Sequence, residues 1–160
     1  MMSILQDPTA YVSPSVTTYP NLNPGYRVYT VDGVRINSTF HVLDHETYYL
    51  DLDEANRTNI PNWKKEYSAK SAYDMKSLFP EDWNDLSSRM MKNETLFNKF
   101  FRNAYKQSPI SKTKCGKACR SNWICDTWSA RSGDPKLCSS IFSEKQYLNY
   151  YYSSFKKHRC

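Results

Sequence analysis

Residues 22–52 constrain the fold more than any other stretch, because they read as two β-strands. In residues 26–31, β-branched and aromatic side chains alternate with a period of two. The turn former Asn23-Pro24-Gly25 opens this run, Asp32-Gly33 ends it, and a second run of the same character covers residues 40–52. An isolated hairpin is marginal in water, so these strands need a larger sheet or helices to pack on.

Beyond residue 59 the residue spacing predicts helices. Pro61 can start one, with Trp63 and Tyr67 four residues apart. A longer apolar face follows, and Asn93 falls on it. Either the helix ends near Lys92 with Asn93 as a cap, or the Asn93 sequon is not used. The face is formed by Leu86, Met90, Phe97, Phe101 and Ala104.

Positive charge is concentrated in the later part of the chain. Residues 1–60 carry 3 Lys and Arg against 7 Asp and Glu, although the whole chain has a net charge of +6. The basic part is either a solvated face of helices or a surface for anionic headgroups or phosphates. The segment 144–160 is predicted to be an amphipathic helix, either docked on the protein or lying on a membrane. Basic charge without a recognition motif does not indicate nucleic acid.

Three sequons, at Asn37, Asn56 and Asn93, and five cysteines favour a secretory route. The chain contains no signal peptide and no apolar run long enough to cross a membrane. We therefore expect an N-terminal part that this sequence lacks.

The cysteines favour disulfides over a zinc site. The spacings fit no common zinc finger and no histidine lies near them. Four of the cysteines allow three connectivities, and spacing alone does not choose among them; they are Cys115, Cys119, Cys125 and Cys138.

The histidines do not indicate a metal site either. His41 and His45 are four apart, which in a strand separates them by about 13 Å at ~3.3 Å per residue. The cluster Asp44-His45-Glu46 could hold a general acid or base, but it has no predicted nucleophile or metal nearby and is interpreted as structural. The chain alone is predicted to bind no cofactor and to be inactive.

Several ordered motifs together resemble the region that follows the catalytic metallophosphoesterase domain in acid sphingomyelinases. They are Asn-Pro-Gly-Tyr-Arg-Val-Tyr at 23–29, Val-Leu-Asp-His-Glu-Thr-Tyr at 42–48, the four spaced cysteines and a last cysteine, Cys160. The resemblance covers residues 10–160.

The resemblance implies an α+β fold, with an N-terminal extended segment and a β-hairpin that would extend a catalytic-domain sheet. A mostly helical, disulfide-containing subdomain would follow. Residues 1–21 would close a truncated metallophosphoesterase domain, and residues 22–160 would form the C-terminal subdomain, with strands in 22–52 and helices in 59–160. The implied disulfides are Cys115–Cys119 and Cys125–Cys138.

The resemblance also implies a function. The parent zinc enzyme would hydrolyse sphingomyelin to ceramide and phosphocholine, in lysosomes or outside the cell. This region would support the fold, the substrate groove and contact with a sphingomyelin-containing or anionic membrane, beside a missing metallophosphoesterase domain. Asn23, Tyr26 and Arg27 would lie near the groove rim. Cys160 would be a free thiol that modulates the zinc, forms a dimer or has no role.

Two other functions remain open on the sequence. One is a non-catalytic secreted module that binds lipid surfaces through its basic helices. The other is a fragment of a related phosphodiesterase that acts on nucleotides.

Overall fold

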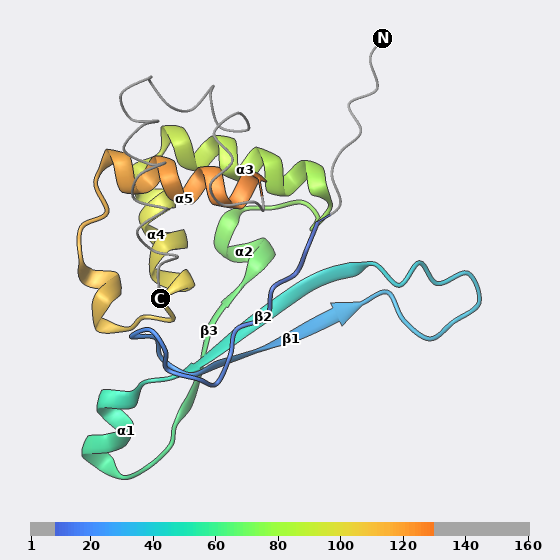
Figure 1. The fold of residues 1–160 in the computed structure, drawn as a ribbon. Coiled ribbons are helices and arrows are strands. Elements are labelled where there is room, and N and C mark those ends of the chain that lie inside the picture. The colour runs from blue at the N-terminus through green and yellow to red at the C-terminus, as the bar shows by residue number, and fades with distance from the viewer. Residues whose placement is uncertain (1–8, 130–160) are drawn as a thin grey trace. The chain divides into compact units, whose positions relative to one another are not determined.

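The structure is a computed structural model that describes residues 9–129 (Figure 1). The chain divides into two compact units. The first comprises Met1–Leu86 and Asn98–Thr113, and the second comprises Ser87–Phe97 and Lys114–Cys160.

The first unit is built on a three-stranded antiparallel sheet in the order β1-β2-β3 (Figure 1). Its strands are β1 (Gly25–Val31), β2 (Val42–Leu50) and β3 (Trp63–Ser68). The predicted hairpin is confirmed as β1 and β2, and β1 ends just before Asp32-Gly33 as expected. The α+β class is confirmed as well.

β3 corrects the prediction that the chain is helical from residue 59. Trp63 and Tyr67 are four residues apart, but they lie in a strand that pairs with β2. The first four residues of β3 alternate between exposed and partly buried, which is the period of a strand. This segment forms a strand because the edge of β2 that does not pair with β1 has free backbone groups. β3 pairs with that edge and satisfies them.

Two short helices flank β3. α1 (Leu52–Thr58) connects β2 to β3; Asp51 caps its start by accepting a hydrogen bond from the Glu54 backbone N–H at 3.0 Å. It ends at Thr58, and Asn59, with φ 56°, is its C-cap. α2 (Ala69–Tyr73) follows β3 directly.

The later part of the described chain is helical, as predicted. Its elements are α3 (Pro80–Lys92), α4 (Glu94–Ala104), the 3-10 helix η1 (Pro109–Lys112) and α5 (Lys117–Ser129). Within residues 9–129, no helix is both long and apolar enough to span a membrane.

Each unit buries its own apolar residues. In the first unit they follow the sheet and reach into α3 and α4; they are Ala69, Tyr73, Met75, Leu78, Leu86 and Phe101. In the second unit they are Met90, Phe97, Cys115, Ile124 and Cys125.

Asn93 separates α3 from α4, which confirms the first of the two alternatives at this sequon. Its side-chain Oδ1 accepts a hydrogen bond from the Leu96 backbone N–H at 3.0 Å, so Asn93 is the N-cap of α4. Asn93 is also exposed, as are the sequon asparagines Asn37 and Asn56. All three remain predicted glycosylation sites.

The disulfide Cys115–Cys119 is present in the second unit, as the resemblance implies. It closes a five-residue segment that leads into α5. Cys138, Cys160 and the predicted helix 144–160 lie outside the described residues.

The cap gives a direct stability test. We expect Asn93→Ala to lower the free energy of unfolding by about 1 kcal/mol, because the first turn of α4 loses its acceptor. Asn93→Asp removes the sequon equally but keeps a capping oxygen, so it should change stability by less than about 0.5 kcal/mol. Urea denaturation of unglycosylated protein measures both, and equal losses in the two variants would contradict the cap.

Candidate functional site

The structure places the three predicted groove residues in different surroundings. Asn23 precedes β1 and is buried, with 5% of its surface exposed. Arg27 pairs with Thr47 on the inner face of the sheet, while Tyr26 pairs with Tyr48 on the outer face. Successive side chains in a strand point to opposite faces, so Tyr26 and Arg27 cannot line the same surface.

Asn23 connects three parts of the first unit. Its side-chain Nδ2 donates to the carbonyl oxygen of Lys106 at 2.9 Å, and its Oδ1 accepts from the backbone N–H of Leu52 at 3.3 Å. The start of β1 is thereby tied to the start of α1 and to the turn after α4. Both the Nδ2 and the Oδ1 atoms of the Asn23 amide are therefore used in hydrogen bonds that hold the fold together.

Arg27 spans the inner face of the sheet. Its guanidinium donates from Nε to Thr47 Oγ1 at 3.1 Å, from Nη2 to the Tyr67 hydroxyl at 3.2 Å and from Nη1 to the Val12 carbonyl at 3.3 Å. One side chain therefore joins β1, β2, β3 and the N-terminal segment. A fork of fixed donors suits such a role better than a lysine would.

Gly25 lies where no side chain fits. A Cβ atom at this position would collide with the buried Lys106 side chain and would lie 3.0 Å from the Tyr48 carbonyl oxygen. The turn former predicted at Asn23-Pro24-Gly25 is therefore also a point of close packing.

Tyr26 belongs to an exposed aromatic patch made with Tyr48 and Trp63. The Tyr26 and Tyr48 rings are stacked with centroids 5.0 Å apart, and the Trp63 ring meets Tyr26 edge-on at 5.1 Å. Tyr26 and Trp63 are 39% and 40% exposed. Beside the patch, Glu46 accepts from the Tyr48 hydroxyl at 2.8 Å and pairs with Lys65. The patch offers flat apolar surface next to a neutralised ion pair.

His45 lies on the inner face and is almost fully buried. Its Nδ1 atom has no hydrogen-bond partner among the described residues. Burial, together with the positive charge of Arg27, lowers the pKa of His45 to about 4, and the carboxylate of Asp44 opposes this shift only partly. The ring is neutral at neutral pH because aromatic rings surround it; they belong to Tyr11, Tyr29, Tyr67 and Trp83.

Glu66 is a second ionisable group of the inner face, and its side chain is partly buried. The register shifts in β3 so that Tyr67 pairs with Thr47 and Lys65 pairs with Tyr48, leaving Glu66 as the bulged residue. Its Oε1 accepts from Gln107 Nε2 at 3.0 Å, and its buried Oε2 has no hydrogen-bond partner among the described residues.

Burial raises the pKa of Glu66 to about 7, against the opposing effects of the Gln107 hydrogen bond and of the Lys106 and Arg27 charges. Lys106 itself is buried, and its pKa is lowered by that burial while Glu66 opposes the shift. Glu66 is therefore poised to bind a proton in mildly acidic solution.

The side chains of Asp44, His45 and Glu46 each make contacts that stabilise the fold. The Asp44 carboxylate accepts from the Ser68 hydroxyl at 2.5 Å and from the Lys70 backbone N–H at 3.2 Å, at the start of α2. These hydrogen bonds hold the pKa of Asp44 below its usual range although burial opposes them. Glu46 is occupied by Lys65 and Tyr48. The arrangement supports the structural interpretation of this cluster.

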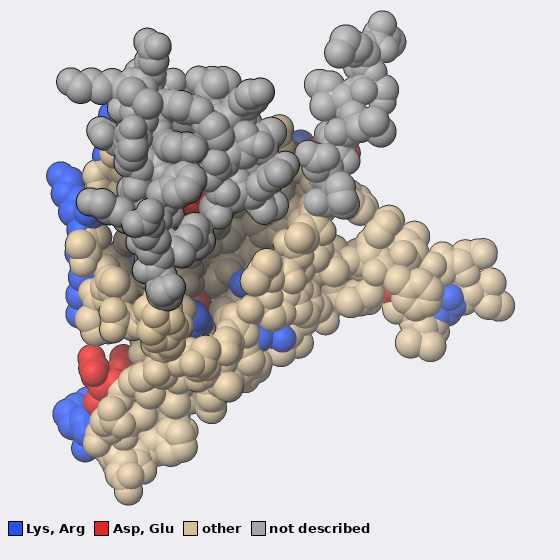
Figure 2. Space-filling view, viewed as in Figure 1, with Lys and Arg blue, Asp and Glu red and all other residues tan. Residues whose placement is uncertain are grey.

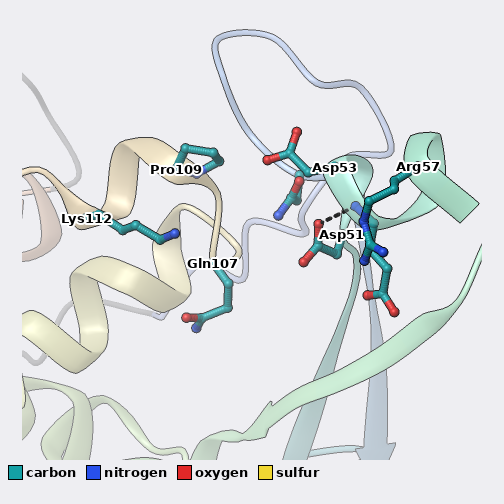
Figure 3. Close-up of a pocket in the computed structure, with 8 residues that line it drawn as sticks. Asp51, Asp53, Arg57, Gln107, Pro109 and Lys112 are labelled. Atoms are coloured by element: carbon teal, nitrogen blue, oxygen red, sulfur yellow. Dashed lines mark hydrogen bonds between the residues drawn. The ribbon is translucent and has the colours of Figure 1, made fainter.

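A polar pocket of about 360 Å³ lies in the first unit (Figure 3). Asp51, Asp53 and Arg57 approach it from α1, and Gln107 and Lys112 approach it from the opposite side. Asp51 is used as the cap of α1, and Glu54, which also lines the pocket, pairs with Lys64. No serine, threonine, cysteine or histidine is among its lining residues. The pocket has mixed charge and no candidate nucleophile.

The part of the chain that the structure describes does not fit a zinc site. It holds no group of three or more His, Cys, Asp or Glu side chains that could bind a metal ion. The two described histidines are also used separately. His41 meets Phe79 edge-on at 5.1 Å, while His45 is enclosed by aromatic rings.

Sequence reasoning missed three features of this region. Tyr48 and Trp63 complete the aromatic patch, and Glu66 is a partly buried acid whose pKa is raised by that burial. Residues 63–66 read Trp-Lys-Lys-Glu, which has no alternation of apolar and polar residues to indicate a strand, and the bulge that turns Glu66 inward has no local signature either.

Comparison with known proteins links the chain to one family. Residues 3–131 match the family described as acid sphingomyelin phosphodiesterase C-terminal region. The chain is 45% identical over 133 residues to a sphingomyelin phosphodiesterase of Bos taurus, a match that covers 82% of the chain and 21% of the relative. The Homo sapiens sphingomyelin phosphodiesterase is 41% identical over 136 residues, which is 84% of the chain and 21% of the relative.

A more distant relative has a different substrate in its name. A cyclic GMP-AMP phosphodiesterase of Homo sapiens is 31% identical over 122 residues, which is 72% of the chain and 26% of the relative. The chain therefore spans about a fifth to a quarter of the length of these relatives.

The Asn23 contacts predict a stability loss. We expect Asn23→Ala to lower the free energy of unfolding by about 2 kcal/mol, because the Lys106 carbonyl and the Leu52 N–H both lose a partner. Asn62, which is exposed, is the control, and Asn62→Ala should change stability by less than about 0.5 kcal/mol. Chemical denaturation distinguishes them; a loss below about 0.5 kcal/mol at Asn23 would refute its bridging role.

Glu66 and His45 predict opposite pH dependences of stability. Folding raises the pKa of Glu66 from 4.5 to about 7, so its contribution is full below pH 4.5 and is lost as the pH rises through about 7. Folding lowers the pKa of His45 from 6.5 to about 4, so its contribution is full above pH 6.5 and is lost as the pH falls through about 4. Between pH 4.5 and 6.5 the two slopes cancel.

Single variants should expose each slope. As the pH falls from 6.5 to 4.5, Glu66→Gln should lose stability relative to wild type by up to about 1.4 kcal/mol per pH unit, and His45→Phe should gain it by a similar amount. Denaturation curves at several pH values measure both. Parallel pH profiles for wild type and both variants would show that neither group titrates as described.

Proposed function

The chain belongs to the acid sphingomyelin phosphodiesterase C-terminal region family, and from this premise we propose that it is the C-terminal region of a phosphodiesterase that hydrolyses sphingomyelin to ceramide and phosphocholine. The identity to relatives named for sphingomyelin, 45% and 41%, exceeds the 31% to the relative named for cyclic GMP-AMP. This difference favours the lipid over a nucleotide as substrate.

The catalytic metals belong elsewhere in this proposal. Two-metal phosphodiester hydrolysis needs a set of ligands that clamps both the attacking and the leaving oxygens. Since the described residues provide no such set, the zinc would be held by a metallophosphoesterase domain that works with this region. The 160-residue chain would not hydrolyse sphingomyelin alone.

The region would act as a support with one substrate-facing surface. On the inner face, the hydrogen bonds of Arg27 hold the three strands in a fixed arrangement. On the outer face, Tyr26 and Trp63 present aromatic surface, which attracts quaternary ammonium groups such as choline. Tyr26 would contact the headgroup or lipid, and Asn23 and Arg27 would hold the strand that carries it.

The proposed compartment is the secretory route, with the lysosome or the outside of the cell as its end. The Cys115–Cys119 disulfide supports an oxidising environment. The sequon asparagines at 37, 56 and 93 are all exposed and therefore open to glycosylation.

A chimera tests the proposed function. The matching C-terminal region of the Bos taurus relative would be replaced by residues 3–131 of this chain, and phosphocholine release from sphingomyelin would be measured. We expect the chimera to hydrolyse sphingomyelin and the 160-residue chain alone to be inactive. An active chain, or a chimera that folds and hydrolyses cyclic GMP-AMP but not sphingomyelin, would refute the proposal.

Tyr26 can be tested in the same chimera. We expect Tyr26→Ala to lower kcat/KM for sphingomyelin by about threefold to thirtyfold, through loss of an aromatic face for the choline. Val28→Ala is the matched control, because Val28 is 49% exposed on the same strand face and is not aromatic. If both variants fold and turn over sphingomyelin at the wild-type rate, Tyr26 has no role in the substrate site.

A further inference from the structure

The loop between β1 and β2, residues 32–41, turns its apolar side chains outward. We name this loop the hairpin tip. Val34 and Ile36 are 105% and 90% exposed, and Phe40 is 68% exposed. The loop extends past the ends of β1 and β2, at the opposite end of β2 from α1 (Figure 1). In the same view, this end of the hairpin consists mostly of residues that carry no charge (Figure 2).

Several polar groups of the hairpin tip bond to one another around Asp32. The Asp32 carboxylate accepts from Arg35 Nη2 at 2.8 Å, from the Thr39 backbone N–H at 2.9 Å and from the Thr39 hydroxyl at 2.7 Å. The Ser38 hydroxyl donates to the Asp32 carbonyl at 2.6 Å. Arg35, Asn37 and Thr39 are themselves exposed, so the tip differs from an ordinary surface loop in exposing large apolar side chains beside its polar ones.

Backbone hydrogen bonds within the tip add to this network. The Asp32 N–H donates to the His41 carbonyl at 2.8 Å, the Arg35 N–H to the Gly33 carbonyl at 2.9 Å and the Ser38 N–H to the Arg35 carbonyl at 3.1 Å. A segment whose polar groups are satisfied internally loses little when it leaves water, and one whose groups are not satisfied loses several kcal/mol per group in a bilayer. The bonds centred on Asp32 therefore satisfy part of the polar groups of the tip before it leaves water.

The charge and size of the hairpin tip favour a lipid surface over a protein. Asp32 and Arg35 form an ion pair, so the tip presents no net charge from carboxylates and guanidinium groups to a macromolecular partner. A stable protein interface buries about 800 Å² on each partner, which three side chains on a narrow turn cannot provide. Insertion among lipid chains needs neither a matching shape nor a large area.

We propose that the hairpin tip inserts Val34, Ile36 and Phe40 into the surface of a zwitterionic bilayer that contains sphingomyelin. The choice of membrane rests on the proposed function. Asn37 lies in the same loop, exposed and within a sequon. A glycan at Asn37 would place sugar next to Ile36, so it would weaken insertion, and glycan occupancy is part of the test.

The test measures the partition of the whole 160-residue chain onto vesicles of phosphatidylcholine and sphingomyelin. The protein is produced without N-glycans and sedimented with vesicles in about 1 M salt, where the Debye length falls to about 3 Å and attraction by the basic residues is screened. We expect the Val34→Ser, Ile36→Ser double variant to lose at least about tenfold in partition. Phe40→Asn, which suits the φ of 55° at that position, should lose several-fold.

The matched control removes the same kind of surface elsewhere. Val12 and Val16 are 82% and 67% exposed in the N-terminal segment, so Val12→Ser with Val16→Ser deletes similar apolar area away from the tip. It should change the partition by less than about twofold. Equal losses in both double variants would show general hydrophobic adsorption and overturn the assignment to the tip.

Two further outcomes would also overturn it. One is an unchanged partition in the folded tip variants, as judged by wild-type denaturation curves. The other is full glycan occupancy at Asn37 in secreted protein that no longer binds vesicles. Because partition requires no hydrolysis, a failure here leaves the chimera assay of the proposed function unaffected, and a failed chimera leaves the partition result intact.

Discussion

The polar inner face of the sheet is the constraint on which the first unit depends. A sheet face that turns away from water is normally apolar, but here Arg27, Thr47, His45 and Glu66 occupy it. Buried polar groups are costly unless they are bonded, so the strands must keep the register that brings Arg27 to Thr47 and Tyr67. Asn23 applies the same principle at the start of β1.

Strand alternation then assigns different tasks to neighbouring residues. The inner side chains fix β1 in place, and the outer ones leave Tyr26 in an exposed aromatic patch with Tyr48 and Trp63. A substitution at Arg27 would therefore affect the exposed aromatic patch indirectly, by disturbing the strand that positions Tyr26. This division is consistent with a region that lacks a metal set among its described residues and would serve the chemistry of another domain by positioning.

The hairpin tip applies the same rule of polar satisfaction in the opposite location. On the inner face, the fold shields polar groups from water, so they form hydrogen bonds with other protein groups. In the tip, which is exposed to water, Asp32 accepts hydrogen bonds from Arg35 and Thr39, while Val34 and Ile36 are exposed. Hydrogen bonds from Thr39 and Arg35 hold the pKa of Asp32 below its usual range.

The sequence by itself determined the hairpin of β1 and β2, the Cys115–Cys119 disulfide through resemblance, and the family. These depend on local periodicity or on ordered motifs, whereas the sequence left open whether Asn93 is a helix cap. Only the tertiary structure decided that Trp63–Ser68 is a strand, because that choice depends on the free edge of β2. Likewise the separation of Tyr26 from Asn23 and Arg27, and the partial burial of Glu66, follow from register and a bulge. The strand register and the bulge determine which way each side chain points, and both depend on contacts between segments that are distant in the sequence.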